Sequence, residues 1–104
     1  MRRPRIVLSD LAGADILDQA DWYGEQAGAK LAQRWENATT STMLQIAANP
    51  RAGAPCKFAA LELRDVRRVP VAGFPRHLVF YQFRGNEIFV LRVIHGARDL
   101  ESLF

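Results

Sequence analysis

The sequence has few of the features that would hold a small fold together covalently or place it in a membrane. Its 104 residues contain one cysteine, Cys56, which excludes an intramolecular disulfide and a cysteine-based zinc site. No apolar run approaches the roughly 18 residues that a transmembrane helix needs. Only three apolar residues separate the opening Met-Arg-Arg-Pro-Arg from Ser9 and Asp10, so we expect no signal peptide. We therefore expect a cytoplasmic protein with no membrane contact.

Internal repeats and low-complexity tracts are also absent from the sequence. The chain is 49% hydrophobic and 24% charged, which is typical of a folded globular protein and unlike a disordered one. Its length suffices for one small core. We therefore expect a single domain over residues 1–104.

Positive charge is unevenly distributed. Residues 1–56 carry six basic and six acidic side chains, whereas residues 57–104 carry eight basic and five acidic ones. The whole excess of +3 thus lies in the second half, mostly as arginine, which suits paired contacts to carboxylate or phosphate. The implied partner is anionic, either nucleic acid or an acidic protein segment, and the alternative is a solvated basic face without a partner.

The first half predicts a strand followed by two helices. Arg5–Leu8 is β-like, and Ser9-Asp10 is a good N-cap for a helix that continues to about Gln26. A second helix is expected over Ala29–Ala48, before a loop over residues 49–57. Apolar positions recur at helical spacing in both segments, at Ala12, Ile16, Ala20 and Tyr23, and at Ala32, Trp35, Thr39, Met43 and Ile46. We expect Trp22, Tyr23 and Trp35 to lie in the core.

The last third predicts an antiparallel meander. Its three β-like runs are Leu61–Val71, His77–Arg84 and Asn86–His95. Gly73-Phe74-Pro75 separates the first two runs, and Gly85-Asn86 between the others is typical of a two-residue hairpin turn. The order βααβββ indicates an α+β domain in which a helical hairpin packs on one face of a small, mostly antiparallel sheet. The other face would then be free for a partner.

One charged residue interrupts the last strand. Alternation places Ile88, Val90, Arg92 and Ile94 on one face and Phe89, Leu91, Val93 and His95 on the other. A strand that is apolar on both faces is central and covered on both sides. Arg92 therefore needs a partner, which would be an acid, a carbonyl or an anionic ligand.

Several short motifs occur along the chain. They are the loop Pro50-x-x-Gly53, the segment Leu63-Arg64-x-x-x-Arg68, the run Gly73-Phe74-x-x-x-Leu78-Val79-Phe80-Tyr81 and the ending Leu91-Arg92-Val93-Ile94-His95-Gly96-Ala97-Arg98-Asp99. With the order βααβββ, these motifs resemble the RelE/ParE superfamily of toxins from type II toxin–antitoxin systems. The resemblance covers nearly the whole chain. The ending is its most specific part, and it is closer to the ParE branch than to the RelE branch.

The resemblance implies a toxin that a small antitoxin neutralises. A strand of the antitoxin would add to the toxin sheet, and its acids would meet toxin arginines. ParE-like members poison DNA gyrase, whereas RelE-like members cut mRNA on the ribosome. On the ParE reading we expect no cofactor and no metal, and DNA contact only through the antitoxin. A third alternative is an antitoxin-binding module that is not toxic.

The residue types offer candidates for both chemistries. For antitoxin or target binding the candidates are Arg64, Arg67, Arg68, Arg76, Arg92 and Arg98. A ribonuclease would use Arg64, Arg68, His95 and Arg98, with His77 as a second proton-transfer candidate. Where RelE-like members have a tyrosine near the chain end, this sequence has Phe104, which cannot titrate. We therefore favour gyrase inhibition, with residues 98–104 as the predicted target-facing segment.

Overall fold

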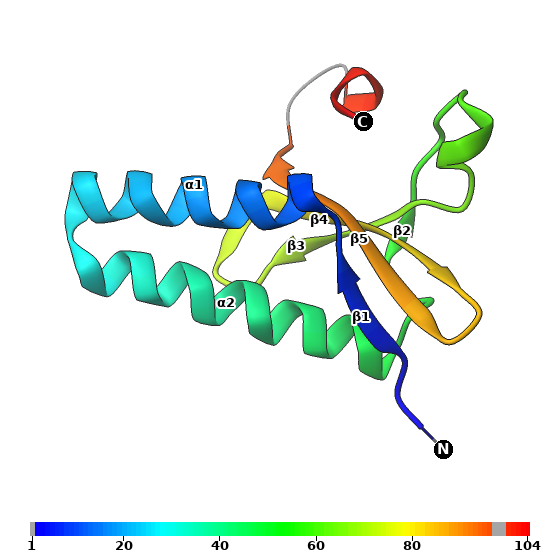
Figure 1. Cartoon of the computed structure of the whole chain (residues 1–104), viewed down its shortest axis with the longest axis horizontal. Coiled ribbons are helices and arrows are strands. Elements are labelled where there is room, and N and C mark those ends of the chain that lie inside the picture. The colour runs from blue at the N-terminus through cyan, green and yellow to red at the C-terminus, as the bar shows by residue number, and fades with distance from the viewer. Residues whose placement is uncertain (1, 97–99) are drawn as a thin grey trace.

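The computed structural model describes residues 2–96 and 100–104, and in these residues a helical hairpin packs on one face of a five-stranded sheet (Figure 1). The helices are α1 (Asp10–Ala27) and α2 (Ala29–Ala48). The strands are β1 (Arg5–Leu8), β2 (Ala54–Pro55), β3 (Arg67–Val71), β4 (Phe74–Arg84) and β5 (Glu87–His95), in the order β1-β5-β4-β3-β2. Only the β1–β5 pair is parallel. The predicted α+β class and its mostly antiparallel sheet are confirmed.

The helical hairpin forms where its local signals predict it. Ser9 caps α1 by accepting a 3.0 Å hydrogen bond from the Ala12 amide, and Gly28, at a positive φ of 96°, separates the two helices. Trp35 is fully buried, and its Nε1 donates to the Ile16 carbonyl at 3.0 Å. Both predicted stripes face the sheet, and Tyr23 packs partly buried against this core.

The prediction that Trp22 belongs to the core is wrong, because 53% of its surface is exposed. Consecutive residues of an α-helix point about 100° apart, since a turn takes roughly 3.6 residues. Trp22 therefore points to a different side of α1 from its neighbour Tyr23. The two rings contact only edge to face, with centroids 5.5 Å apart.

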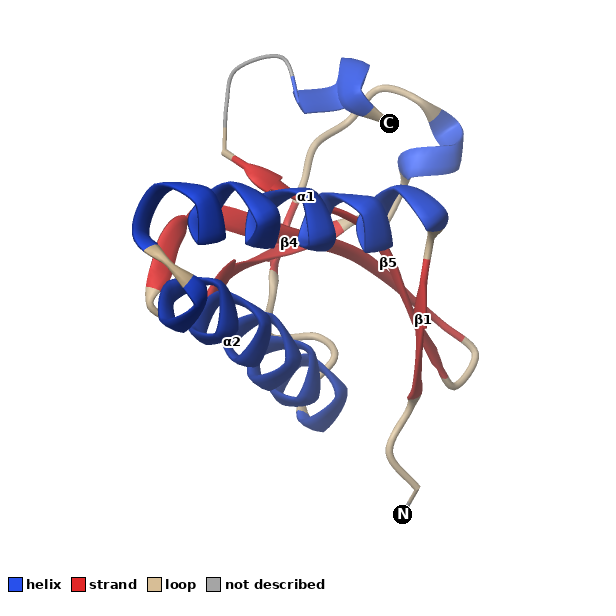
Figure 2. Cartoon of the chain, turned by 60° about the vertical axis from the view of Figure 1, so that its left-hand side comes forward, coloured by secondary structure: helices blue, strands red, loops and turns tan. Residues whose placement is uncertain are grey.

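The sheet face away from the helices is also partly covered, contrary to the expectation that it would be free. Leu63, Val66 and Phe80 are buried there in a second core. Its cover comes from the 3-10 helix Leu61–Leu63, the preceding loop and the C-terminal 3-10 helix Leu100–Leu103. The two short helices lie close together at one end of the molecule (Figure 2).

Three predicted segments differ in detail. Leu61–Val71 is not one strand, and only Arg67–Val71 pairs as β3. Residues 61–63 are helical, with the Leu63 and Arg64 amides donating to the Ala60 and Leu61 carbonyls at 3.0 and 3.2 Å, and Gln82 Nε2 donates to the Glu62 and Arg64 carbonyls at 3.1 and 2.8 Å. The predicted loop 49–57 contains β2, which pairs with β3. β4 begins at Phe74, because the turn is made by Ala72 and Gly73, whose φ is 81°.

A β-bulge changes the alternation predicted for β5. Phe80 pairs with Arg92 and Tyr81 with Val90, so Leu91 has no partner in β4. Ile88 and Val90 face the helices as predicted for one face, but after the bulge Val93 joins that side. Leu91 and Ile94 belong to the second core. The hairpin turn at Gly85-Asn86 is confirmed, since β4 ends at Arg84 and β5 begins at Glu87.

Neither helix in the described part of the chain is long and apolar enough to cross a membrane.

Candidate functional site

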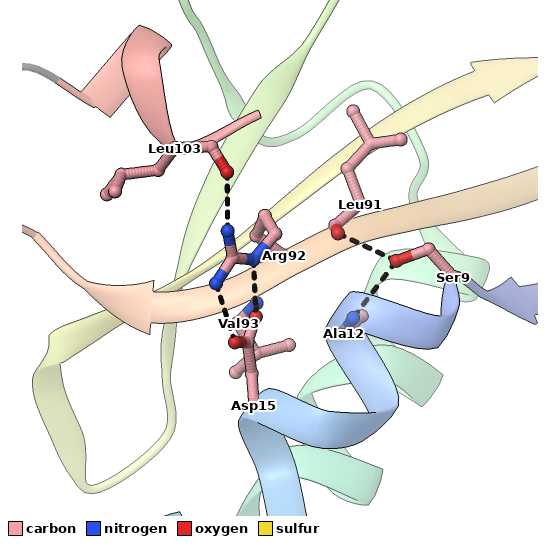
Figure 3. Close-up of polar contacts among 7 residues, drawn as sticks. All are labelled: Ser9, Ala12, Asp15, Leu91, Arg92, Val93 and Leu103. Atoms are coloured by element: carbon pink, nitrogen blue, oxygen red, sulfur yellow. Dashed lines mark hydrogen bonds and ion pairs between the residues drawn. The ribbon is translucent and has the colours of Figure 1, made fainter.

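The conspicuous polar site of the fold joins Arg92 of β5 to Asp15 of α1 (Figure 3). Arg92 Nε and Nη2 donate to the two Asp15 carboxylate oxygens, each at 2.8 Å, in a bidentate pair. Arg92 Nη1 also donates to the Leu103 carbonyl of the C-terminal helix. Only 17% of the Arg92 side chain and 12% of the Asp15 side chain are exposed.

The position of this pair follows from the unequal lengths of β1 and β5. β1 pairs with β5 only up to Val90, after which the edge of β5 has no neighbouring strand. Side chains from the start of α1 take its place: Ser9 Oγ donates to the Leu91 carbonyl at 2.8 Å, and the Val93 amide donates to Asp15 Oδ2 at 3.0 Å. Asp15 thus binds both the side chain and the backbone of this edge.

Arg92 therefore has the partners that the sequence predicts for it: the acid Asp15 and the backbone carbonyl of Leu103. The hydrogen bonds that Arg92 donates to Asp15 raise the pKa of the Arg92 guanidinium, so it is charged at every physiological pH. Arg92 is thus already engaged within the chain. A role for it in binding a partner stays a prediction.

The other predicted arginines are not gathered in one place. Arg67 Nη1 donates to the Arg51 and Gly53 carbonyls at 3.0 and 2.8 Å, and Arg68 Nη1 lies 3.7 Å from Cys56 Sγ. Arg64 and Arg76 are exposed, and within residues 2–96 and 100–104 their guanidinium groups have no hydrogen bond or ion pair. Arg98 lies outside the described residues.

The two histidines lie opposite each other on β4 and β5. His77 pairs with His95 in the register, and their ring centroids are 5.4 Å apart. His77 also contacts Trp35 and Tyr23, at 4.8 and 6.4 Å between centroids. Burial, and secondarily the neighbouring His95, lowers the pKa of His77, which favours its neutral form.

Two of the ribonuclease candidates, His95 and Arg68, lie on opposite faces of the sheet. His95 lies opposite His77, whose ring contacts the helix residues Tyr23 and Trp35. Arg68 pairs with Phe80, which is buried in the second core on the opposite face. An acid–base group and a charge-stabilising group must both reach the same phosphate. The described residues do not bring His95 and Arg68 together for that purpose.

The end of the chain is folded back on the second core. Phe104 contacts Phe58 and Phe80 with both centroid distances at 5.4 Å, and it is partly buried. Glu101 accepts hydrogen bonds from the Ala59 and Ala60 amides, at 2.9 and 2.8 Å. In the predicted target-facing segment, these two side chains therefore make internal contacts.

The sequence did not identify Asp15 as the partner of Arg92, nor the hydrogen bonds between the Tyr81 hydroxyl and the loop at Pro50 and Gly53. Tyr81 Oη donates to the Pro50 carbonyl at 2.7 Å and accepts from the Gly53 amide at 3.2 Å. Burial is the larger influence on Tyr81, and it raises the pKa of the phenol. A usable signal existed for Asp15, since Arg92 required a partner and α1 carries five acids, but helical spacing alone does not indicate which acid is within reach.

The fold is similar to that of a known structure described as the chromosomal ParDE TA system from P. aeruginosa. The TM-score is 0.74 at 17% sequence identity, and the match covers 91% of this chain and 98% of that one. At this identity the likeness establishes the fold alone. No curated protein sequence matches the chain.

A helical hairpin on a mixed five-stranded sheet, with the basic excess in its strands, thus places the chain in the ParDE fold class. The model of the family described as ParE toxin of type II toxin-antitoxin system, parDE, matches residues 6–100. The chain belongs to this ParE toxin family.

Proposed function

We propose that this protein inhibits DNA gyrase by trapping it with cleaved DNA, and that a cognate antitoxin neutralises it. The observation that carries the proposal is the ParE family match over residues 6–100. The alternative, ribosome-dependent mRNA cleavage, receives less support. Phe104 has no proton to exchange and packs in the second core, and His95 is separated from Arg68 by the sheet.

The surface features fit an acidic antitoxin segment. Arg64 and Arg76 are exposed without an internal partner among the described residues, so contact with carboxylates would break no existing ion pair. β1 lies at one edge of the sheet and β2 at the other. An edge strand offers backbone groups to an added strand, while the arginines select its charge.

A gyrase assay on antitoxin-free protein tests the target. Supercoiling and cleaved DNA are scored together against a range of protein concentrations, and we expect cleaved DNA to accumulate. The matched measurement is translation-dependent mRNA cleavage with the same preparation. Intact gyrase activity together with mRNA cuts would overturn the proposal in favour of the ribonuclease. Growth unaffected by overproduction would favour a binding module.

Co-expression with the neighbouring reading frame tests the antitoxin. We expect a small protein with an acidic tail to copurify, and the single substitutions Arg64→Glu and Arg76→Glu each to weaken that complex. Arg84→Glu is the control for net charge, because Arg84 is exposed at the hairpin end of β4. A chain that stays monomeric beside its neighbour's product would contradict this part of the proposal.

A further inference from the structure

A cavity of about 630 Å³ lies between α1 and the ends of β4 and β5. Its walls include Asp18 and Trp22 from α1, and His77 and His95 from the strands. Asp18 and Trp22 are four residues apart, which places them on the same side of the helix. Trp22 exposes 53% of its surface here. A large aromatic residue exposed at a cavity is typical of a residue that anchors a protein interface.

The net charge of α1 is negative, whereas that of the whole chain is positive. The helix carries Asp10, Asp15, Asp18, Asp21 and Glu25 and no basic residue, although the whole chain has a net charge of +3. At the cavity, Asp15 is neutralised by Arg92. Asp18 is exposed and has no hydrogen bond or ion pair among the described residues. One free carboxylate therefore lies one turn from an exposed indole.

The His77 side of the cavity is held in place by packing, and His77 adds no positive charge to it at neutral pH. The His77 ring packs edge-on against Trp35, 4.8 Å away, and its burial favours the neutral imidazole. The Asp15–Arg92 pair fixes α1 to β5 at the cavity wall. An ammonium or guanidinium group entering here would meet the Asp18 carboxylate and the exposed indole of Trp22, and both groups attract cations.

We propose that this cavity, defined by Asp18, Trp22, His77 and His95, docks a lysine- or arginine-bearing segment of the target protein, gyrase. The inference rests on the proposed function and adds the surface on which the target is bound. Charge distinguishes the two partners on the helix side of the cavity: α1 is acidic and favours a cationic segment, whereas an acidic antitoxin tail is attracted to Arg64 and to Arg76, which borders the adjoining hollow beside His77 and His95. The proposal places the target-facing surface at this cavity, because Glu101 and Phe104 of the C-terminal segment already make internal contacts.

Two substitutions and two matched controls test this assignment in the gyrase cleavage assay. Asp18→Asn and Trp22→Ala should each raise the protein concentration needed for cleaved DNA by about tenfold, as for interface anchors. Asp21→Asn makes the same charge change on the same helix, and Leu17→Ala removes an apolar side chain that is 62% exposed. Neither control residue lines the cavity, so both should act as wild type.

Oxidative footprinting of the wild-type protein adds a readout that does not depend on activity. Trp22 is accessible to hydroxyl radicals, whereas Trp35 is buried and serves as the internal reference. We expect gyrase to reduce oxidation of Trp22 severalfold, and the co-expressed antitoxin to leave it unchanged. Protection by the antitoxin and not by gyrase would overturn the inference.

The outcomes also separate the inference from the proposed function. Wild-type protein that poisons gyrase, with Asp18→Asn and Trp22→Ala equal to it, would overturn only the docking site. Wild-type protein without effect on gyrase would overturn both. Equal losses in all four variants would show an effect of helix charge or folding, and they would also overturn the site.

Discussion

Gly53 illustrates, for a single residue, why the loop motif Pro50-x-x-Gly53 needs a glycine at its last position. The loop Pro50-x-x-Gly53 closes around the Tyr81 hydroxyl, which binds the backbone of both its ends. A Cβ on Gly53 would lie 2.5 Å from Tyr81 Oη and 3.0 Å from Tyr81 Cε1. The glycine is therefore required by close approach, since its φ is not among the positive values.

We predict that Gly53→Ala lowers the free energy of unfolding by about 1–3 kcal/mol, as for overpacking of a filled site. Gly13→Ala is the matched control. A Cβ at Gly13 meets nothing within 4 Å, and alanine is the better helix former, so this variant should be neutral or slightly more stable. Urea unfolding measures both. Equal stabilities of the two variants would contradict the role given to Tyr81.

Among the secondary-structure elements, Asp15 takes the hydrogen-bonding place of a neighbouring strand at the end of β5. Its two oxygens bind Arg92 and the Val93 amide, beyond the last residue that β1 reaches. Ser9 extends the same arrangement by capping α1 and binding β5 at once. The first turns of α1 are thus attached to β5 by polar contacts as well as by packing.

Asp15→Ala should cost about 3 kcal/mol of unfolding free energy, because it leaves a mostly buried Arg92 and a strand-edge amide without their acid. Asp18→Asn, one turn further along the exposed side, should change stability by less than about 0.5 kcal/mol. Thermal or urea unfolding of both proteins measures the difference. An Asp15→Ala protein as stable as Asp18→Asn would show that solvent replaces the acid at no cost.

The C-terminal 3-10 helix is a second element held by polar contacts. Glu101 binds the amides of Ala59 and Ala60, whose loop covers the second core. Glu101→Ala should leave the helical hairpin unchanged and speed amide hydrogen exchange at Ala59 and Ala60 by about tenfold, the equivalent of about 1.4 kcal/mol in local opening. Glu25→Ala, which removes an exposed acid from α1, is the control. Unchanged exchange at Ala59 and Ala60 in the Glu101→Ala protein would show that Glu101 does not hold this loop in place.

At the scale of the whole molecule, His77 links stability to pH. Its pKa lies below the ordinary value of 6.5 when the protein is folded, first because of burial and second because of His95. Between the folded and unfolded values the unfolded chain binds more protons, so stability rises with pH there. The contribution is fully present above pH 6.5 and is lost as the pH falls through the folded value.

We therefore expect wild-type protein to lose more stability between pH 7.5 and 5 than His77→Gln does. The comparison removes the acid-induced losses that both proteins share. His95→Gln should reduce the pH effect without abolishing it, because burial is the larger cause of the lowered pKa of His77. Urea unfolding at several pH values measures this, and parallel curves for wild type and His77→Gln would refute it.

Much of the fold was determined by local rules of the sequence. Ser9 at the N-cap, apolar spacing and Gly28 predict both helices to within a residue or two. Gly85-Asn86 predicts the β4–β5 hairpin in the same way. These signals are enough to predict the elements, because a helical turn or a tight hairpin depends on interactions between residues that are close in the sequence. Trp22 was misplaced because it is adjacent in sequence to a core residue and yet lies on another side of the helix.

The pairing of Arg92 with Asp15 depends on the tertiary structure. Arg92 had to find a partner, but Asp15 is 77 residues away, and its reach depends on β1 ending before β5 does. The bulge at Leu91 and the cover over the second core depend equally on distant strands and loops. Such contacts join parts of the chain that no local pattern relates. Local patterns therefore predict the helices, the hairpin and the need for a partner at Arg92, whereas the packing of these elements selects Asp15 as that partner.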